Sequence, residues 1–161
     1  MSMRFPLDAD MAATRRQFVC MGLCAVVAGG LAGCSNPTPA PRAARLKREN
    51  CQYCGMPVSD PRYVAEIWDN EYQRVRVYDD FGCAVLAASA RSELGRSDIG
   101  FWVADETEPS RWLDARSARY RSGVATPMGH GYAAGPENSH PQDFATASAA
   151  VRAKALCNHS T

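Results

Sequence analysis

The sequence lacks a charge excess of either sign. Its 161 residues carry 18 Lys and Arg against 17 Asp and Glu, a formal charge of +1. Such a chain has no general field to attract nucleic acid, so we expect no nucleic-acid partner. It also lacks an apolar run of the roughly 20 residues that a membrane-spanning helix needs. With 46% hydrophobic and 22% charged residues, the composition excludes a disordered, a collagen-like and a polytopic membrane protein.

The N-terminal segment has the layout of an export signal. Arg15 and Arg16 precede an apolar stretch, Phe18–Ala32, that ends in small residues. The paired arginines are typical of a twin-arginine signal, with Sec export as the alternative. The stretch runs into LAGC, which is similar to a bacterial lipobox and predicts lipidation at Cys34; a chance cysteine is the alternative. Ser35 then favours the outer membrane, so we expect a lipid-anchored protein on the periplasmic side of a membrane.

The sequence divides into four predicted segments. Residues 1–33 are the signal peptide, and 34–50 form a lipidated, Pro-rich and basic tether. The folded part comprises a first unit, 51–106, and a second unit, 107–161. Four thiols remain for other roles after export and lipidation, at Cys51, Cys54, Cys83 and Cys157.

The first unit has the pattern of two strands, a helix and a strand. Strands are predicted at Tyr63–Trp68 and Tyr72–Tyr78, rich in aromatic and β-branched residues, with a turn at 69–71. Asp79 or Asp80 is suited to cap a following helix, which we expect to stop at Gly95. A third strand is predicted at 100–104. Cys83 lies on the apolar stripe of the helix, which favours a buried, inert thiol.

The second unit gives a weaker pattern. Short strands are predicted at 112–113, 119–121 and 132–134, and a helix is predicted from Pro141 through Ala155. No final strand follows. We therefore expect an α+β fold of two ββαβ units, with the second truncated at its C-terminus. His140, His159 and Cys157 lie in or near the tail, where solvent exposure is the default expectation.

Two segments carry soft metal ligands. The first is CQYCGM, with Cys51, Cys54 and Met56, and the second is TPMGHG, with Met128 and His130. Thiolate, thioether and imidazole together are the ligand set of a thiophilic ion, above all Cu(I). Each piece alone has an ordinary explanation: a disulfide or redox pair, a core methionine, a surface histidine. The glycines of both segments allow the sharp turns that a shared site requires.

These motifs in combination resemble the NosL family. The match rests on CQYCGM, then RYVAEI, then DDFGC, then TPMGHG, together with the lipoprotein signal. NosL proteins are lipoprotein accessory factors for nitrous oxide reductase and act as copper chaperones for its copper-sulfide centre. The resemblance implies two ββαβ units, a Cu(I) cargo, no enzymatic activity, and nitrous oxide reductase and its maturation machinery as partners.

The resemblance also implies the site residues. It places Cys54 and Met56, from the CGM motif, and Met128, from the TPMG motif, at the copper site. His130 is a fourth candidate because it follows within two residues. Cys51 is either a further thiolate ligand or the disulfide partner of Cys54 when copper is absent.

Two other functions remain open. One is a thiol–disulfide redox protein using Cys51 and Cys54, although the Gly-Met-Pro that follows does not favour the helix usual after a redox CxxC. The other is a lipoprotein held together by structural zinc or a disulfide that binds another protein. Covalent haem attachment is excluded, because Gly55 follows Cys54 where a histidine is required.

Overall fold

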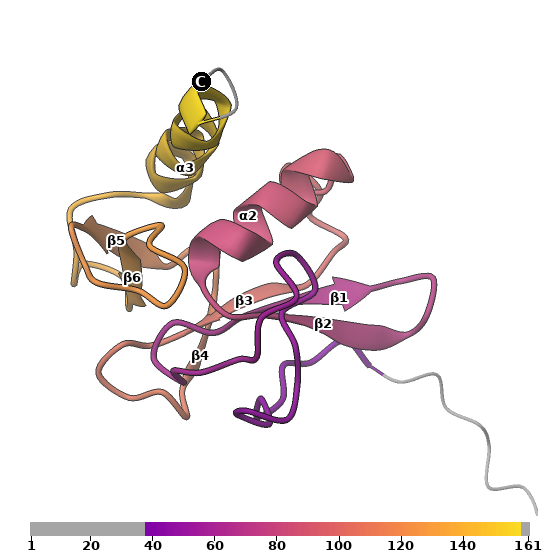
Figure 1. Cartoon of the computed structure of the whole chain (residues 1–161). Coiled ribbons are helices and arrows are strands. Elements are labelled where there is room, and N and C mark those ends of the chain that lie inside the picture. Colours follow the sequence, from indigo (N-terminus) through magenta and orange to yellow (C-terminus); the bar gives the residue numbers. More distant parts are fainter. Residues whose placement is uncertain (1–37, 159–161) are drawn as a thin grey trace, which may run out of the picture. The chain divides into compact units, whose positions relative to one another are not determined.

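The computed structural model describes residues 38–158, which form an α+β fold (Figure 1). The strands are β1 (Ala65–Asp69), β2 (Arg74–Tyr78), β3 (Phe101–Ala104), β4 (Trp112–Asp114), β5 (Arg119–Ser122) and β6 (Tyr132–Gly135), and the helices are α2 (Phe81–Ala90) and α3 (Phe144–Asn158). The predicted α+β class is confirmed. Within 38–158, no helix combines the length and the apolar character needed to cross a membrane.

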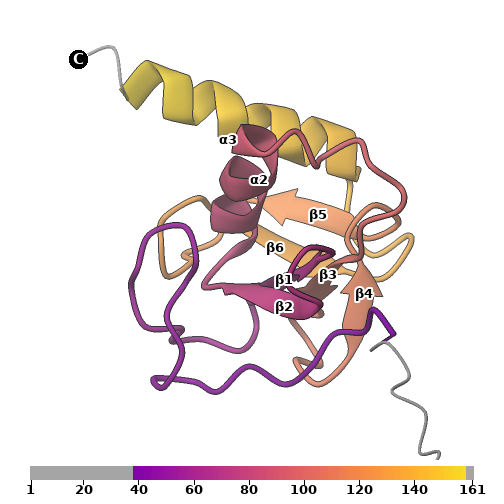
Figure 2. The same cartoon turned by 90° about the vertical axis from the view of Figure 1, so that its right-hand side faces the viewer.

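The larger sheet has the order β2-β1-β3-β4, and its neighbouring strands are all antiparallel. Helix α2 packs over one face of it, and α3 packs against α2 (Figure 2). The predicted β1–β2 hairpin is present, with residues 70–73 as its connection. β1 is a central strand because it pairs with β2 on one side and β3 on the other, and its alternate residues Ala65 and Ile67 belong to the same core cluster as α2.

The second half of the chain does not repeat the order of the first. β4 pairs with β3 in the larger sheet, and β5 and β6 form a separate antiparallel pair before α3. The predicted strands and helix are found, each close to its expected place. Their order is strand, strand, strand and helix, so the predicted second ββαβ repeat is not confirmed.

An aromatic cluster joins the two halves. The ring of Phe81, the first residue of α2, lies 4.4 Å from that of Tyr120 in β5 and 6.0 Å from that of Tyr132 in β6, measured between centroids. Phe144 of α3 adds edge contacts to Phe81 and to Phe101 of β3. These contacts hold the β5–β6 pair beside the N-terminal end of α2.

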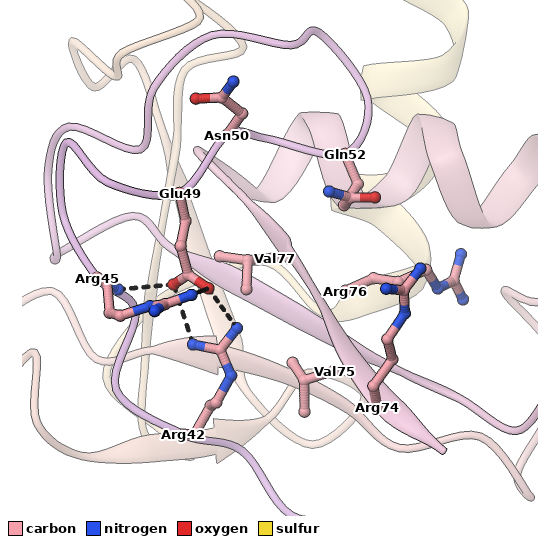
Figure 3. Close-up of a pocket in the computed structure, with 9 residues that line it drawn as sticks. All are labelled: Arg42, Arg45, Glu49, Asn50, Gln52, Arg74, Val75, Arg76 and Val77. Atoms are coloured by element: carbon pink, nitrogen blue, oxygen red, sulfur yellow. Dashed lines mark hydrogen bonds and ion pairs between the residues drawn. The ribbon is translucent and has the colours of Figure 1, made fainter. Parts of the chain in front are cut away.

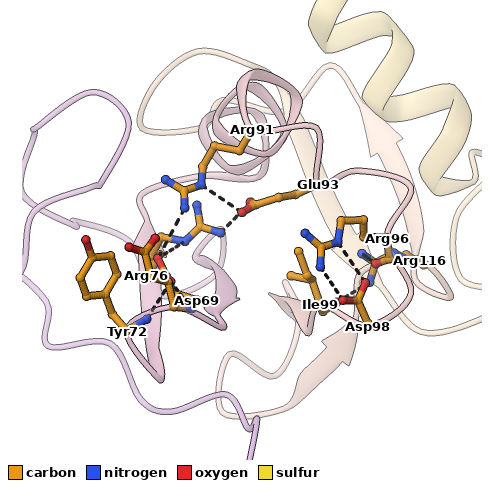
Figure 4. A network of polar contacts seen from close by, with 10 residues as sticks. Asp69, Tyr72, Arg76, Arg91, Glu93, Arg96, Asp98, Ile99 and Arg116 are labelled. Carbon is orange, nitrogen blue, oxygen red and sulfur yellow. Dashed lines mark hydrogen bonds and ion pairs between the residues drawn. The ribbon is translucent and has the colours of Figure 1, made fainter.

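Helix α2 ends five residues before the expected stop at Gly95. Its C-cap is Arg91, and the Glu93 N–H donates to the Ala88 carbonyl at 2.8 Å, which turns the chain back. The buried Glu93 carboxylate accepts from Arg76 of β2 at 2.6 Å, and Asp69 lies on the other side of the same guanidinium (Figure 4). The residues directly after α2 thus place the Glu93 carboxylate against Arg76 in a buried ion pair.

The end of the predicted tether packs onto the folded part. The Glu49 carboxylate accepts from the Arg42 guanidinium and from the Arg45 N–H (Figure 3). The Lys47 N–H donates to the Val58 carbonyl, and Asn50 bridges to Pro57. The chain before Cys51 is therefore part of the fold and pairs with the residues that follow the cysteine loop.

Candidate metal centre

The loop from Cys51 to Met56 is a tight turn that directs amide hydrogens at sulfur. The Cys51 N–H donates to the Met56 carbonyl at 2.8 Å, and the Gly55 N–H donates to the Cys51 carbonyl at 3.0 Å. Gly55 has φ of +76°, a value that glycine adopts without steric cost. The Sγ of Cys51 accepts from the backbone N–H groups of Tyr53, Cys54 and Asp79. The loop is thus shaped to stabilise a thiolate before any metal arrives.

Cys83 supplies a third thiol from the first turn of α2. Its N–H donates to the carboxylate of Asp80, the N-cap residue, at 3.0 Å, which fixes the turn. The Sγ atoms of Cys51, Cys54 and Cys83 all lie within 4.8 Å of one another. A trigonal ion with metal–sulfur bonds of about 2.3 Å holds its sulfurs about 4 Å apart. The three thiols are therefore close to the spacing of a three-coordinate site.

The thiols differ in how readily they lose a proton. Hydrogen bonds from the Cys83 thiol and from the backbone outweigh the effect of burial and lower the pKa of Cys51 to about 5. The hydrogen bond to Cys51 and burial together raise the pKa of Cys83. Burial also raises the pKa of Cys54. Cys51 is therefore the thiol of this cluster that most readily becomes a thiolate, with Cys83 as its hydrogen-bond donor.

The loop between β5 and β6 also reaches Cys83. The Thr126 hydroxyl donates to Asp80 at 2.9 Å and accepts from the Gly131 N–H at 3.1 Å, so the loop is tied to the N-cap of α2. A ligand nitrogen of His130, the Sγ of Cys83 and a carboxylate oxygen of Asp80 lie within 4.8 Å of one another. The segments CQYCGM and TPMGHG therefore meet at Cys83.

The two candidate methionines occupy different environments. Met56 is 54% exposed, and its backbone N–H donates to the Cys54 sulfur. Met128 is half-buried and packs against the core. Their roles as ligands stay a prediction. The proposed lipidation site Cys34 and the signal residues Arg15 and Arg16 lie outside the described residues.

From the sequence we expected Cys83 to be a buried, inert thiol of the core. Its part in the candidate metal site was not predicted. The residue is fully buried, as expected, but its sulfur is common to both ligand groups. The available signal was DDFGC, in which the cysteine follows the capping aspartate by three residues and so lies in the first turn of a helix. Helix periodicity gave no reason to expect two other thiols beside it.

The fold and the site together define a small α+β protein with a cluster of thiols suited to a soft metal ion. No family model and no curated protein matches the sequence. Among solved structures, the chain is similar to the copper chaperone NosL from Shewanella denitrificans, with 15% sequence identity and a TM-score of 0.50. The match covers 73% of this chain and 88% of that one. The chain therefore has a NosL-like fold.

Proposed function

We propose that this protein is a Cu(I) carrier that binds one ion per chain and is not an enzyme. The observation that supports this most directly is the group of three sulfurs within 4.8 Å, contributed by a preformed loop and by the first turn of α2. Two members, Cys51 and Cys83, are buried, and Cys54 is half-exposed. An ion held there is shielded on one side and reachable on the other, as a carrier requires.

The geometry favours Cu(I) over structural zinc. Zinc in a structural site takes four ligands in a tetrahedron. Among the His, Cys, Asp and Glu side chains of residues 38–158, the ligand atoms that lie within 4.8 Å of one another form groups of three and no group of four. Three soft ligands suffice for Cu(I), and the thioethers of Met56 and Met128 suit the same ion.

Low coordination also supports release. A three-coordinate ion can be attacked by an incoming ligand before any of its own bonds has broken. The half-exposed Cys54 gives that ligand an approach, and the exposed Met56 lies two residues further along the chain. The site therefore combines tight binding with transfer to a client.

The test is a competition between Cu(I) and Zn(II) under reducing conditions, with a chromogenic chelator reporting the free metal. We expect saturation at one Cu(I) per chain and a preference for Cu(I). Cys54→Ser should weaken Cu(I) binding by about 100-fold or more, and Met128→Leu by about 10-fold, by comparison with effects at metal ligands and their supporting contacts. Cys157→Ser, which removes an exposed thiol of α3, is the matched control and should leave the affinity unchanged.

Other outcomes would assign one of the alternative functions. Preference for Zn(II) would indicate a structural site. Turnover of a disulfide substrate that depends on Cys51 and Cys54, without Cu(I) binding, would indicate a redox protein. Unchanged Cu(I) affinity in both Cys54→Ser and Met128→Leu would exclude the proposed site.

We further propose that the protein is exported through its twin-arginine-like signal and lipidated at Cys34. In this proposal it faces the periplasm, with the outer membrane favoured, and delivers Cu(I) to nitrous oxide reductase while the copper-sulfide centre of that enzyme is assembled. Support comes from the sequence motifs and from the NosL-like fold. Labelling with a fatty acid that is lost in Cys34→Ser tests the anchor. The copper content of nitrous oxide reductase in cells lacking this protein tests the client.

A further inference from the structure

The sulfur of Cys83 is shared between two groups of ligand atoms. One group consists of the sulfurs of Cys51, Cys54 and Cys83, and the other consists of the Cys83 sulfur, a nitrogen of His130 and a carboxylate oxygen of Asp80. Within each group the ligand atoms all lie within 4.8 Å of one another. Cys83 itself has no exposed surface, whereas Cys54 and His130 are half-buried. A buried sulfur thus connects two places where the site approaches solvent.

Gly82 makes room for His130 at this point. A Cβ placed on Gly82 would lie 2.1 Å from the Cγ of His130 and 2.4 Å from its Cβ. Real Cβ atoms do not approach so closely, and these histidine atoms are near its backbone, so any larger residue at Gly82 forces the histidine and its loop away. Gly82 has a helical position in which alanine is otherwise favourable. The missing side chain is therefore what allows the imidazole to reach the first turn of α2.

Asp80 positions both Cys83 and the loop that carries His130, and its own carboxylate is a poor ligand for Cu(I). One of its oxygens accepts from the Cys83 N–H at 3.0 Å, and the other accepts from the Thr126 hydroxyl at 2.9 Å. Carboxylate is also a hard ligand that Cu(I) does not prefer. The soft donors left in this second group are the sulfur of Cys83 and the imidazole of His130, with Met128 two residues before the histidine in the same loop.

We propose that Cys83 is the common ligand of two adjoining Cu(I) positions, a thiol position with Cys51 and Cys54 and a second position with His130. This inference rests on the proposed function. The ion moves between the positions by ligand exchange: a Cu–N bond to His130 forms, the Cu–S bonds to Cys51 and Cys54 break, and the Cu–S bond to Cys83 is kept. Copper stays in the +1 state, no electron is transferred, and the released sulfurs take up protons from solvent as needed.

The first test isolates the second position. In Cys51→Ser/Cys54→Ser, we expect the full-length chain to bind one Cu(I) more weakly than the wild type. Adding Gly82→Ala should weaken that residual binding by a further factor of about 10 to 100, the range found when contacts that orient a ligand are lost. Gly95→Ala is the matched control, because a Cβ there meets nothing within 4 Å. Residual binding that Gly82→Ala leaves unchanged, or a folded double variant that binds no Cu(I), would overturn the proposal.

The second test keeps all three thiols and so does not depend on the stability of the double variant. The imidazole NMR signals of His130 should shift or broaden when wild-type protein takes up one equivalent of Cu(I), because the ion visits this ring. In Gly82→Ala the ring should not respond, while Gly95→Ala should behave as the wild type. A His130 signal that is insensitive to Cu(I) in the wild type would overturn the proposal. Absence of any Cu(I) binding by the wild type would refute the proposed function instead, so the two failures are distinguishable.

Discussion

Replacing Glu66 with glutamine should change how the stability of this protein depends on pH. Glu66 is the second residue of β1, paired with Val77 and Trp102 of the neighbouring strands, and its side chain has no exposed surface. One carboxylate oxygen accepts from the Arg42 N–H at 2.8 Å, and the other has no hydrogen-bond partner among residues 38–158. Burial of this group raises its pKa from 4.5 to about 7.

Whether stability rises or falls with pH depends on whether the folded or the unfolded chain binds the Glu66 proton more tightly. The folded chain binds the Glu66 proton more tightly than the unfolded chain, so the stabilising contribution is complete below pH 4.5 and is lost as the pH rises to about 7. The two pKa values differ by about 2.5, and each unit of difference is worth 1.36 kcal/mol. The free energy of unfolding should therefore fall by about 3 kcal/mol across this interval because of Glu66 alone.

Chemical denaturation of the wild type and of Glu66→Gln at pH 5 and at pH 8 measures this effect. Because glutamine stays neutral, the variant should be close to the wild type at pH 5 and more stable by up to about 3 kcal/mol at pH 8. Glu137→Gln removes an exposed carboxylate and serves as the control. A difference between Glu66→Gln and the wild type that is equal at the two pH values would refute the reasoning.

Three further substitutions test contacts that hold the fold. Arg76→Met leaves the buried Glu93 carboxylate without its main partner and should cost about 3–5 kcal/mol in urea denaturation; a cost below about 1 kcal/mol would contradict the buried ion pair. Asp80→Ala removes the N-cap of α2 and should lower stability by about 1–2 kcal/mol and also weaken Cu(I) binding, whereas unchanged binding would show that the cap does not orient the ligands. Tyr120→Phe removes the hydroxyl that donates to the Ala115 carbonyl at 2.6 Å and should cost about 1 kcal/mol in thermal denaturation, with an unchanged melting temperature as the contrary result.

Local features of the structure could be predicted from the sequence. The aromatic and β-branched residues predicted the β1–β2 hairpin, and the pair Asp79 and Asp80 predicted the start of α2, where Asp80 is the N-cap. Gly55, between Cys54 and Met56, indicated the sharp turn that the structure has at this residue. Each of these depends on residues only a few positions apart, whose backbone preferences and hydrogen bonds act without help from the rest of the chain.

Tertiary structure decided what distant residues do together. Cys83 has the sequence pattern of a core thiol, and only packing of α2 against the cysteine loop and the β5–β6 loop makes it the meeting point of two ligand groups. Glu66 is a charged residue in a strand, and it is buried in the structure, where the backbone of Arg42, 24 residues earlier in the chain, contacts it. The physical reason is the same in both cases. Burial and proximity arise from contacts between segments far apart in the chain, and a local pattern of residue types contains no record of which segments will pack together.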